Sequence, residues 1–574
     1  MKRGIHYFML ITISSSFLIS CSNNAPKETK LIPKEAMIVV SIDPNAFKEK
    51  LQNGGISIDS ILSKGYQKDS TKPEDQQKVA DFRNASGINW EEKIHFFTYS
   101  QKENKNANIL NLLFSISDSA VFNQYLNKLN WKDKKAFSKE DDYQYLPLSD
   151  NNILAWNKEH AMVMIYEDKV VPYYDTVNMR FVIPEKKDNK KTMLTELSRL
   201  FSQKESASIA SVKEFGKMFK TKAEGYVFAS SGGSLAALSG MPLQLPKLEE
   251  LVNNNYTSAT LAFEEGKIIA KSVTHTNPLL SSILKKYAGP TVNTDLIKTF
   301  PSQNINAIVM ASFNPAIFGG VLKELEVEGF VNEFLKKSGV SAAELYGAIK
   351  GDIAVVVSDL GVGMTEPQTR KDELSLVVKK PMGKLIINIP AGKPESFKKV
   401  MDKITARGFA VKKGNEYKSG DLFGQMGIYM VANEQGIIIA SDSVTYAQYK
   451  SNNSKATINN EALNYFKGKS TVIYIDVANT LNGFIKDASG GYYNSLTTAK
   501  STIKDIMGSS ENFSDNSISS VLEINMQNQK QNSLVTLVSL FTNIAVDTRA
   551  VARREKEMEE KLFPSGIPTV IRAN

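Results

Sequence analysis

The residues of this chain that could do chemistry are few and lie far apart. There is one cysteine, Cys21, and beyond residue 20 the histidines are His95, His160 and His275. A zinc or iron site needs several such ligands at short spacing, and none of these residues has a second histidine or cysteine nearby. We therefore expect no metal site and no cofactor. We interpret the three histidines as structural or exposed side chains.

Serine nucleophiles have equally little support in the sequence. Ser282-Ile-Leu-Lys285 and Ser501-Thr-Ile-Lys504 match the S-x-x-K pattern, but no K-T-G motif and no G-x-S-x-G elbow occurs. A Ser/His/Asp triad can still assemble from distant residues. A carboxylate hydrolase also stays open as an alternative, because it needs only two acids about 5 to 10 Å apart. We name no catalytic residue and favour a protein that is not an enzyme.

The segment in front of Cys21 has the order of a secretory signal. Two basic residues open the chain, and the apolar stretch over 5–20 is short for a membrane span. Leu-Ile-Ser then leads directly into Cys21, and this order resembles the lipobox of bacterial lipoproteins. The resemblance implies that residues 1–20 are a signal peptide that is removed. It also implies that Cys21 is the lipid attachment site and carries diacylglycerol and acyl chains such as palmitate.

Residues 21–31 are polar and lack apolar periodicity, which predicts a lipidated tether. In lipoproteins bound for the surface of Bacteroides-like bacteria, acidic residues follow the cysteine, whereas Ser22, Asn23 and Asn24 follow here. The resemblance therefore favours the outer membrane, with the body facing the periplasm. The cell surface is the alternative.

The composition is that of a folded exported protein. Hydrophobic residues make up 42% and charged residues 23% of the chain, and its formal charge is +9. Basic runs such as EKKDNKK at 185–191 contain acids, so we expect no nucleic-acid partner. A single cysteine allows no disulfide within the chain, and the fold must therefore rest on its cores.

The most informative pattern is an internal repeat. AMIVVSIDPNAFKEKL at 36–51 parallels NAIVMASFNPAIFGGVL at 306–322: each predicts a strand, an Asx-Pro corner at Asp43 or Asn314, and a helix. Five further segments recur in the same order. They are 85–99 with 337–357, 112–129 with 386–404, 152–168 with 427–442, 212–238 with 460–485, and 258–275 with 519–538.

These pairs also predict particular elements. Asn89-x-x-Glu92 and Ser341-x-x-Glu344 predict capping-box helix starts, and 152–168 and 427–442 predict hairpins. The last pair, 258–275 with 519–538, predicts two strands before a final helix.

The repeat defines the predicted domains. We expect a first half over 32–290 and a second over 300–556, joined by VNTDLIKTFPSQ, with a tail over 557–574. Short, hairpin-linked strands interleaved with helices predict an α+β fold with mainly antiparallel sheets rather than a doubly wound one. The strands alternate imperfectly between apolar and polar residues, which indicates that helices cover one sheet face.

The whole pattern resembles a known family. The Ile32-Pro33-x-x-Ala36 opening, the strand before Asp43-Pro44, the lipobox and the two related halves resemble the Bacteroides-type lipoproteins of domain-of-unknown-function family 4836. Since that family has no assigned activity, the resemblance implies no site residues.

Three classes of function follow from these observations. We favour a lipid-anchored, non-enzymatic binding or scaffold module whose partner is an envelope protein or a glycan. A surface glycan or ligand binder is the first alternative, and it would use exposed aromatic residues. Trp90, Trp131 and Trp156 are the tryptophans available, and all three lie in the first half. The carboxylate hydrolase is the second alternative.

Overall fold

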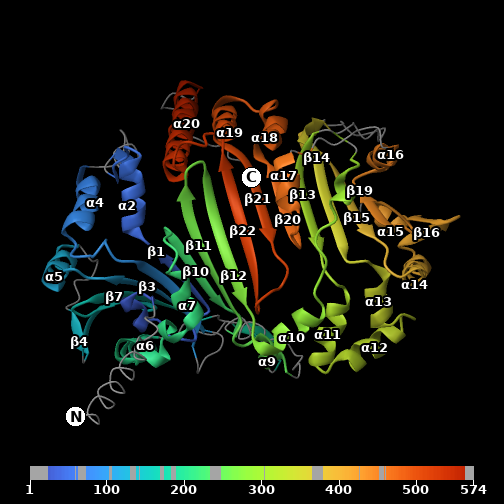
Figure 1. Cartoon of the computed structure of the whole chain (residues 1–574). Coiled ribbons are helices and arrows are strands. Elements are labelled where there is room, and N and C mark those ends of the chain that lie inside the picture. Colours follow the sequence, from blue (N-terminus) through green and yellow to red (C-terminus); the bar gives the residue numbers. More distant parts are fainter. Residues whose placement is uncertain are drawn as a thin grey trace, which may run out of the picture. The chain divides into compact units, whose positions relative to one another are not determined.

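The computed structural model describes the chain from residue 24 to residue 562 with internal gaps (Figure 1). The described ranges are 24–58, 60–61, 73–101, 107–129, 137–140, 142–168, 173–176, 178–182, 189–232, 247–300, 302, 304–364, 379–425, 427–451, 458 and 460–562. The predicted signal peptide, Cys21, Trp131 and residues 563–574 lie outside them. Within these ranges no helix is both long enough and apolar enough to cross a membrane.

The chain divides into two compact units. Unit 1 comprises Met1–Asn45, Pro73–Gly240 and Tyr256–Thr260, and unit 2 comprises Ala46–Lys72, Met241–Asn255 and Leu261–Asn574. This division follows compactness and does not test the predicted halves, 32–290 and 300–556.

Unit 1 is built on an antiparallel sheet with the strand order β10-β1-β2-β3-β7-β6-β5-β4. Its strands are β1 (Ile38–Ile42), β2 (Ile94–Ser100), β3 (Ala107–Ser115), β4 (Ser138–Glu140), β5 (Tyr143–Ser149), β6 (Asn152–Trp156), β7 (His160–Asp168) and β10 (Gly225–Ser230). A separate hairpin pairs β8 (Tyr173–Asp175) with β9 (Arg180–Val182).

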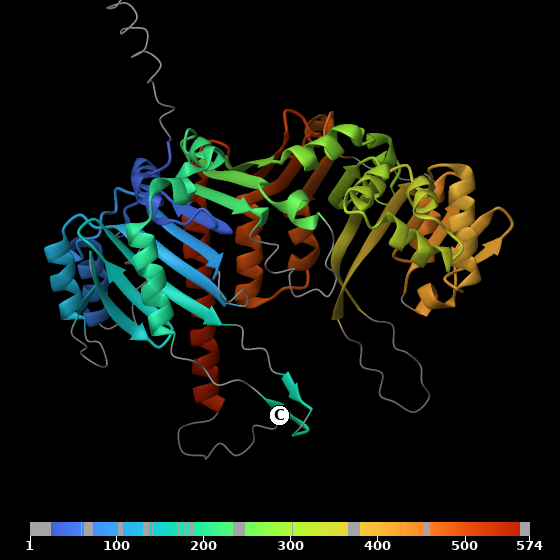
Figure 2. The ribbon, with the colours of Figure 1, turned by 90° about the horizontal axis from the view of Figure 1, so that it is seen from below.

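Helices cover unit 1 from both sides. They are η1 (Lys27–Leu31), α4 (Pro73–Ala85), α5 (Ser119–Lys128), α6 (Lys190–Ser202), η2 (Glu205–Ala207), η3 (Ile209–Ser211) and α7 (Lys213–Met218). Helices α6 and α7 lie against one sheet face (Figure 2), where Phe215 packs edge-on against Phe228 of β10. On the other face, Phe122 of α5 packs against Phe114 and Trp156.

Unit 2 contains a longer antiparallel sheet with the order β12-β22-β21-β20-β13-β14-β15-β19-β18-β17-β16. Its strands are β12 (Lys267–His275), β13 (Ile305–Ser312), β14 (Asp352–Met364), β15 (Lys379–Pro390), β16 (Ala410–Lys413), β17 (Glu416–Ser419), β18 (Tyr429–Asn433), β19 (Gly436–Ala440), β20 (Thr471–Asp476), β21 (Ile503–Ser510) and β22 (Ser517–Met526); β11 (Tyr256–Glu264) has residues in both units.

The helices of unit 2 enclose separate cores. They are α2 (Pro44–Asn53, mostly in this unit), α9 (Leu248–Val252), α10 (Pro278–Lys286), η4 (Thr294–Ile297), α11 (Ala316–Glu324), α12 (Glu328–Lys336), α13 (Ala342–Ala348), α14 (Pro394–Ala406), α15 (Asp421–Gln425), α16 (Ser443–Ser451), α17 (Asn460–Phe466), α18 (Val477–Ile485), α19 (Gly490–Thr502) and α20 (Ser533–Leu562). The largest core packs Phe466 of α17 and Ile297 of η4 against Ile308, Val356 and Val472 of the sheet.

The strand pairings of the two units correspond. The order β10-β1-β2-β3-β7-β6-β5-β4 in unit 1 is matched by β20-β13-β14-β15-β19-β18-β17-β16 in unit 2. Asp43 lies at the corner between β1 and α2, and Asn314 at the corner between β13 and α11, where its Oδ1 accepts a hydrogen bond from the backbone N–H of Ala316. This correspondence is what the predicted repeat requires. Common descent of the halves stays a prediction.

Several sequence predictions are confirmed. The protein is α+β, and every strand pairing described above is antiparallel. The two hairpins form as β6–β7 and β18–β19. Ser341 and Glu344 make a complete capping box at the start of α13.

Other predictions of local structure are wrong. Asn89 starts no helix: its Oδ1 accepts a hydrogen bond from the N–H of Glu91 in a turn, because β2 begins at Ile94 and leaves no room for a helix. The segment after β22 is not a second strand, since α20 begins at Ser533. The hairpin that matches β11–β12 in order is therefore β21–β22.

The predicted tether and linker also belong in part to the fold. Residues 27–31 form η1 with Glu28, Thr29 and Leu31 buried, so the predicted tether over 21–31 is too long at its C-terminal end. The predicted linker contributes Ile297 and Phe300, both almost fully buried, to the main core of unit 2. Apolar residues within a polar segment are drawn into the nearest core because their burial removes them from water.

Candidate binding site

One face of the unit 2 sheet is left partly uncovered. In register across β22, β20 and β13, the exposed fractions are 42% for Leu522, 37% for Ile473 and 39% for Val309. Val355 of β14 and Ile387 of β15 continue the same row, since each is the direct partner of its neighbour. Residues directly opposite in an antiparallel pair point to the same face, so these five side chains form one apolar row. We call this row the open sheet face.

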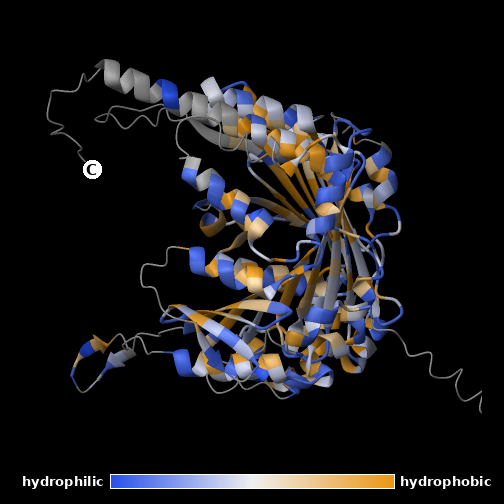
Figure 3. Ribbon diagram, turned by 90° about the vertical axis from the view of Figure 1, so that its left-hand side faces the viewer, coloured by the Kyte–Doolittle hydropathy of each residue, from blue (hydrophilic) through white to orange (hydrophobic). Residues whose placement is uncertain are grey.

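Among the described helices, α14 and α20 pack at the two ends of the open sheet face, and α18 lies against β13, β14, β20 and β21 between them. Ile387 pairs with Ile439, and that end of the row packs under α14 through Phe397 and Met401. Near the other end, Ile524 packs with Leu534 of α20 and Leu51 of α2. Between them, Gly508 of β21 has no side chain to fill the space beside Leu522 and Ile473. The result is an apolar strip on a sheet whose strands are largely hydrophobic (Figure 3).

Unit 1 carries a similar row on its own sheet. Val227 of β10 pairs with Val40, Val40 pairs with Phe96, and Phe96 pairs with Leu112 of β3. Val227 and Phe96 are exposed, by 38% and 45%. Exposed apolar residues that are scattered need no explanation, whereas residues gathered in register on a sheet mark an interaction surface.

The strand sequences carry a weak signal for this site. Strands such as NAIVMAS and TVIYID carry apolar residues at successive positions, where a sheet with one solvated face alternates with polar ones. This pattern predicts helices on one sheet face. Helices do cover one face, where Phe466 of α17 packs against Ile308 and Val472. On the opposite face, Val309, Ile473 and Leu522 stay more than a third exposed.

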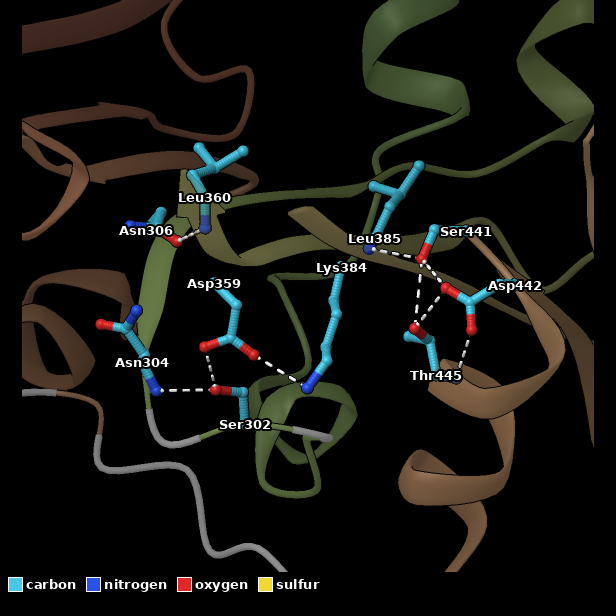
Figure 4. A network of polar contacts seen from close by, with 10 residues as sticks. All are labelled: Ser302, Asn304, Asn306, Asp359, Leu360, Lys384, Leu385, Ser441, Asp442 and Thr445. Atoms are coloured by element: carbon cyan, nitrogen blue, oxygen red, sulfur yellow. Dashed lines mark hydrogen bonds and ion pairs between the residues drawn. The ribbon is translucent and has the colours of Figure 1, made fainter. Parts of the chain in front are cut away.

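A polar network fixes the strand ends beside the open sheet face (Figure 4). Ser302 donates a hydrogen bond to Asp359 Oδ1 at 2.7 Å, and Lys384 Nζ lies 2.9 Å from Asp359 Oδ2. Asp359 sits at φ +53° in the bulge between Ser358 and Gly361. Burial alone would raise the pKa of Asp359, but the bonds from Ser302 and Lys384 hold it below its usual value. Because Lys384 is already paired with this carboxylate, we interpret the network as structural.

A second part of the same network caps the N-terminus of α16. Asp442 Oδ1 accepts a hydrogen bond from the backbone N–H of Thr445, and Ser441 Oγ accepts one from the N–H of Leu385 (Figure 4). Asn306 Oδ1 accepts a bond from Leu360 N, while its Nδ2 is buried without a partner among the described residues. These contacts tie α16 and β13 to β14 and β15, and none of them presents a nucleophile to solvent.

The structure does assemble a serine, a histidine and a carboxylate, but it buries them. In unit 1, His95 Nδ1 lies 2.7 Å from Ser41 Oγ, and His95 Nε2 lies 2.9 Å from Glu28 Oε1. Ser41 and His95 are fully buried, so no substrate reaches them. Burial alone would raise the pKa of Glu28, yet the hydrogen bond and charge of His95 lower it. These buried contacts hold η1 against β1 and β2.

The other two histidines lie on β7 and β12. His160, at the start of β7, is buried, and its Nδ1 lies 3.5 Å from Ser115 Oγ. Burial lowers the pKa of His160, which favours the neutral ring. His275 lies half-buried at the end of β12, where it pairs with Ser517. Among the described residues, no group of three or more His, Cys, Asp or Glu side chains could hold a metal ion.

One pair of carboxylates bears on the hydrolase alternative. Asp476 of β20 and Asp505 of β21 are direct cross-strand partners, and burial together with Asp505 raises the pKa of Asp476. Asp505 is only 3% exposed, and its two oxygens contact Asn525 Nδ2 at 2.7 Å and Lys504 Nζ at 3.5 Å. Asp476 caps α18 through the N–H of Asn479. We therefore interpret both acids as structural.

The two described tryptophans do not form a ligand surface. Trp156 is 1% exposed in the core beneath α5. Trp90 packs edge-on against Phe82, and its indole N–H donates a hydrogen bond to the carbonyl of Arg83. We therefore interpret both tryptophans as residues that pack within unit 1.

Fold and site together define a two-unit α+β protein with apolar sheet surfaces and a serine–histidine–carboxylate set that is buried. Residues 28–534 match the family described as Domain of unknown function (DUF4836), and the chain belongs to that family. No curated protein matches it.

Solved structures offer only a weak likeness. Two crystal forms of TP0453, IV and I, share 13% and 12% sequence identity with this chain. The matches cover 46% and 48% of this chain and 86% and 83% of TP0453, with TM-scores of 0.24 and 0.23. At such scores the likeness carries no argument.

Proposed function

We propose that this protein is a lipid-anchored, non-enzymatic binding module of the cell envelope and that its open sheet face holds an apolar ligand. The observation that carries the proposal is the exposed row of Val309, Ile473 and Leu522 on β13, β20 and β22. Leaving three large apolar side chains exposed in register costs about 25 cal/mol per Å² of apolar surface, which a bound apolar group would recover.

The anchoring part of the proposal rests on the sequence alone. Cys21 behind a short apolar signal is the attachment site, and the missing acids behind it favour the periplasmic face of the outer membrane. The structure contributes one supporting point: the fold begins at η1, so few residues separate Cys21 from the body. A short separation keeps the binding surfaces close to the membrane.

The binding part is tested with an uncharged apolar probe. Phenylnaphthylamine should bind the Cys21→Ala protein, purified without detergent, and its fluorescence should rise on transfer from water. Val309→Glu and Ile473→Glu should each weaken this binding at least about tenfold, because a carboxylate on the row opposes an apolar ligand.

Val444→Glu is the matched control. Val444 is 63% exposed on α16 and lies outside the row, so this variant should bind the probe like the wild type. Absence of binding by the wild type, or an equal loss in Val444→Glu, would refute the proposal.

A further inference from the structure

A polar cavity lies on the face of the unit 2 sheet opposite the open sheet face. Its volume is about 390 Å³, and it opens between α16, η4 and the ends of β15, β18 and β19. Its walls include Leu296 and Ile438, which pack against the main core of this unit. Small-ligand sites typically measure roughly 300 to 1,000 Å³, so the cavity has room for a sugar-sized molecule.

The wall of this cavity is unusually rich in carboxamides. Four of them line it: Asn293 at the start of η4, Asn388 of β15, and Asn433 and Gln435 at the hairpin between β18 and β19. The side-chain oxygens of Asn293 and Asn433 already accept hydrogen bonds from the backbone N–H groups of Asp295 and Gln435. A carboxamide carries two donors and an acceptor oxygen with two lone pairs, so the four together still offer the mixture of donors and acceptors that hydroxyl groups require. Asn388 Nδ2 also donates a hydrogen bond to the hydroxyl of Tyr449 at 3.1 Å, which orients both side chains.

Two tyrosines of α16 complete the same wall. Tyr446 and Tyr449 lie one helical turn apart and are both half-buried, so each presents ring surface as well as a hydroxyl. Burial raises the pKa of Tyr449, which keeps its hydroxyl protonated. A ring face beside several hydrogen-bonding groups suits a ligand that is polar at its edge and has a C–H face, such as a pyranose ring.

The charge of the wall is positive. Lys350 and Lys450 line the cavity with side chains that are each 63% exposed, and no carboxylate is among the described residues that line it. Both lysines are also paired with acids outside the lining: Glu416 lies 3.2 Å from Lys450 and 3.4 Å from Lys418, and Asp352 lies 3.9 Å from Lys350. The described residues that line the cavity thus include two cations and no anion, which favours an anionic group on the ligand.

We propose that this cavity binds a sugar that carries a single anionic group. The four carboxamides and Tyr449 would bond the ring hydroxyls, Tyr446 would pack against the ring, and Lys350 and Lys450 would hold the anionic group. The inference goes beyond the proposed function, because it concerns another face of the sheet and another kind of ligand. A carboxylate and a phosphate would both satisfy the lysines, and the experiment separates them.

The test is ligand-observed saturation-transfer NMR on the full chain with three small probes. Glucuronic acid, glucose 6-phosphate and methyl glucoside carry a carboxylate, a phosphate and no charge. We expect at least one anionic sugar to bind about tenfold more tightly than methyl glucoside, and the tighter one identifies the anionic group. The Lys350→Gln/Lys450→Gln double variant should abolish this preference.

Two sets of control variants test whether the effect belongs to this cavity. Lys336→Gln removes the same charge from α12, where Lys336 is 75% exposed, and should leave sugar binding unchanged. Val309→Glu should bind sugar normally, and the double lysine variant should still bind phenylnaphthylamine, so the two proposals can fail separately. Equal binding of all three sugars, no binding of any, or wild-type preference in the double variant would overturn the inference.

Discussion

The side chain of Glu28 holds the N-terminal helix η1 in place through its contact with His95. Its carboxylate is buried against His95, and removing it leaves a buried ring nitrogen without its partner. We expect Glu28→Ala to lower the free energy of unfolding by about 3 kcal/mol, as for other buried pairs that lose one member. Chemical denaturation measures the change.

The matched control for Glu28 is Glu205→Ala, at an exposed position of η2 in the same unit. It should stay within about 0.5 kcal/mol of the wild type. An equally small effect of Glu28→Ala would mean that the contact with His95 does not stabilise the fold.

His160 should make stability depend on pH. Its folded pKa lies below the unfolded value of about 6.5, because burial penalises the charged ring. The unfolded chain thus binds the proton more readily, so the contribution of His160 is fully present above about pH 6.5 and is lost as pH falls toward the folded pKa. His160→Gln should flatten this loss.

Denaturation midpoints between pH 5 and 8 check this expectation. Glu28 does not interfere there, since its depressed pKa places the loss of its contribution below about pH 4.3. A variant whose curve runs parallel to that of the wild type would show that another group is responsible.

At the scale of elements, α18 and β14 meet through two glycines. A Cβ built on Gly483 would lie 1.7 Å from the carbonyl oxygen of Leu360, and one built on Gly361 would lie 3.0 Å from that of Gly483. Because the obstructing atom is backbone, Gly483→Ala has to push the helix away from the strand. We expect a loss of about 2 kcal/mol, in the usual range for overpacking.

Gly329→Ala is the control for this contact. Gly329 also lies in a helix, α12, but a Cβ added there would meet no described atom within 4 Å. There alanine should stabilise by up to about 1 kcal/mol through helix propensity. Thermal unfolding measures the change in melting temperature of each variant. A higher melting temperature for Gly483→Ala than for the wild type would disprove the close contact.

At the scale of the whole molecule, the prediction concerns the anchor. A fatty-acid probe fed to cells should label the wild type and not Cys21→Ala, because only a thiol forms the thioether of a lipoprotein. Equal labelling of both proteins would mean that Cys21 is not the attachment site, and the protein would then need another route to the membrane.

The side of the membrane is a separate whole-molecule prediction. Protease added to intact cells should leave the protein uncut, whereas permeabilised cells should lose it. Immunoblotting follows the outcome, and a periplasmic protein serves as the reference. Cleavage in intact cells would place the protein on the surface, the alternative that we kept open.

Local features of this protein could be predicted from its sequence. The capping box at Ser341, the hairpin over 152–168 and the strand-to-helix corners at Asp43 and Asn314 each depend on residues a few positions apart. Such features were readable because backbone geometry and short-range hydrogen bonds decide them. The antiparallel α+β class followed from the same short-range signals. The family resemblance came from their order along the chain.

Which surfaces stay open could not be predicted, because it depends on how distant segments pack. Val309, Ile473 and Leu522 form one row only because β13, β20 and β22 are brought into one sheet, and whether a helix covers them depends on packing far along the chain. The same holds for His95, which meets Glu28 across 67 residues, and for the cavity that joins Asn293 to Lys450. Burial is a property of the assembled molecule, so no local pattern distinguishes an apolar residue that packs in a core from one that is left to bind.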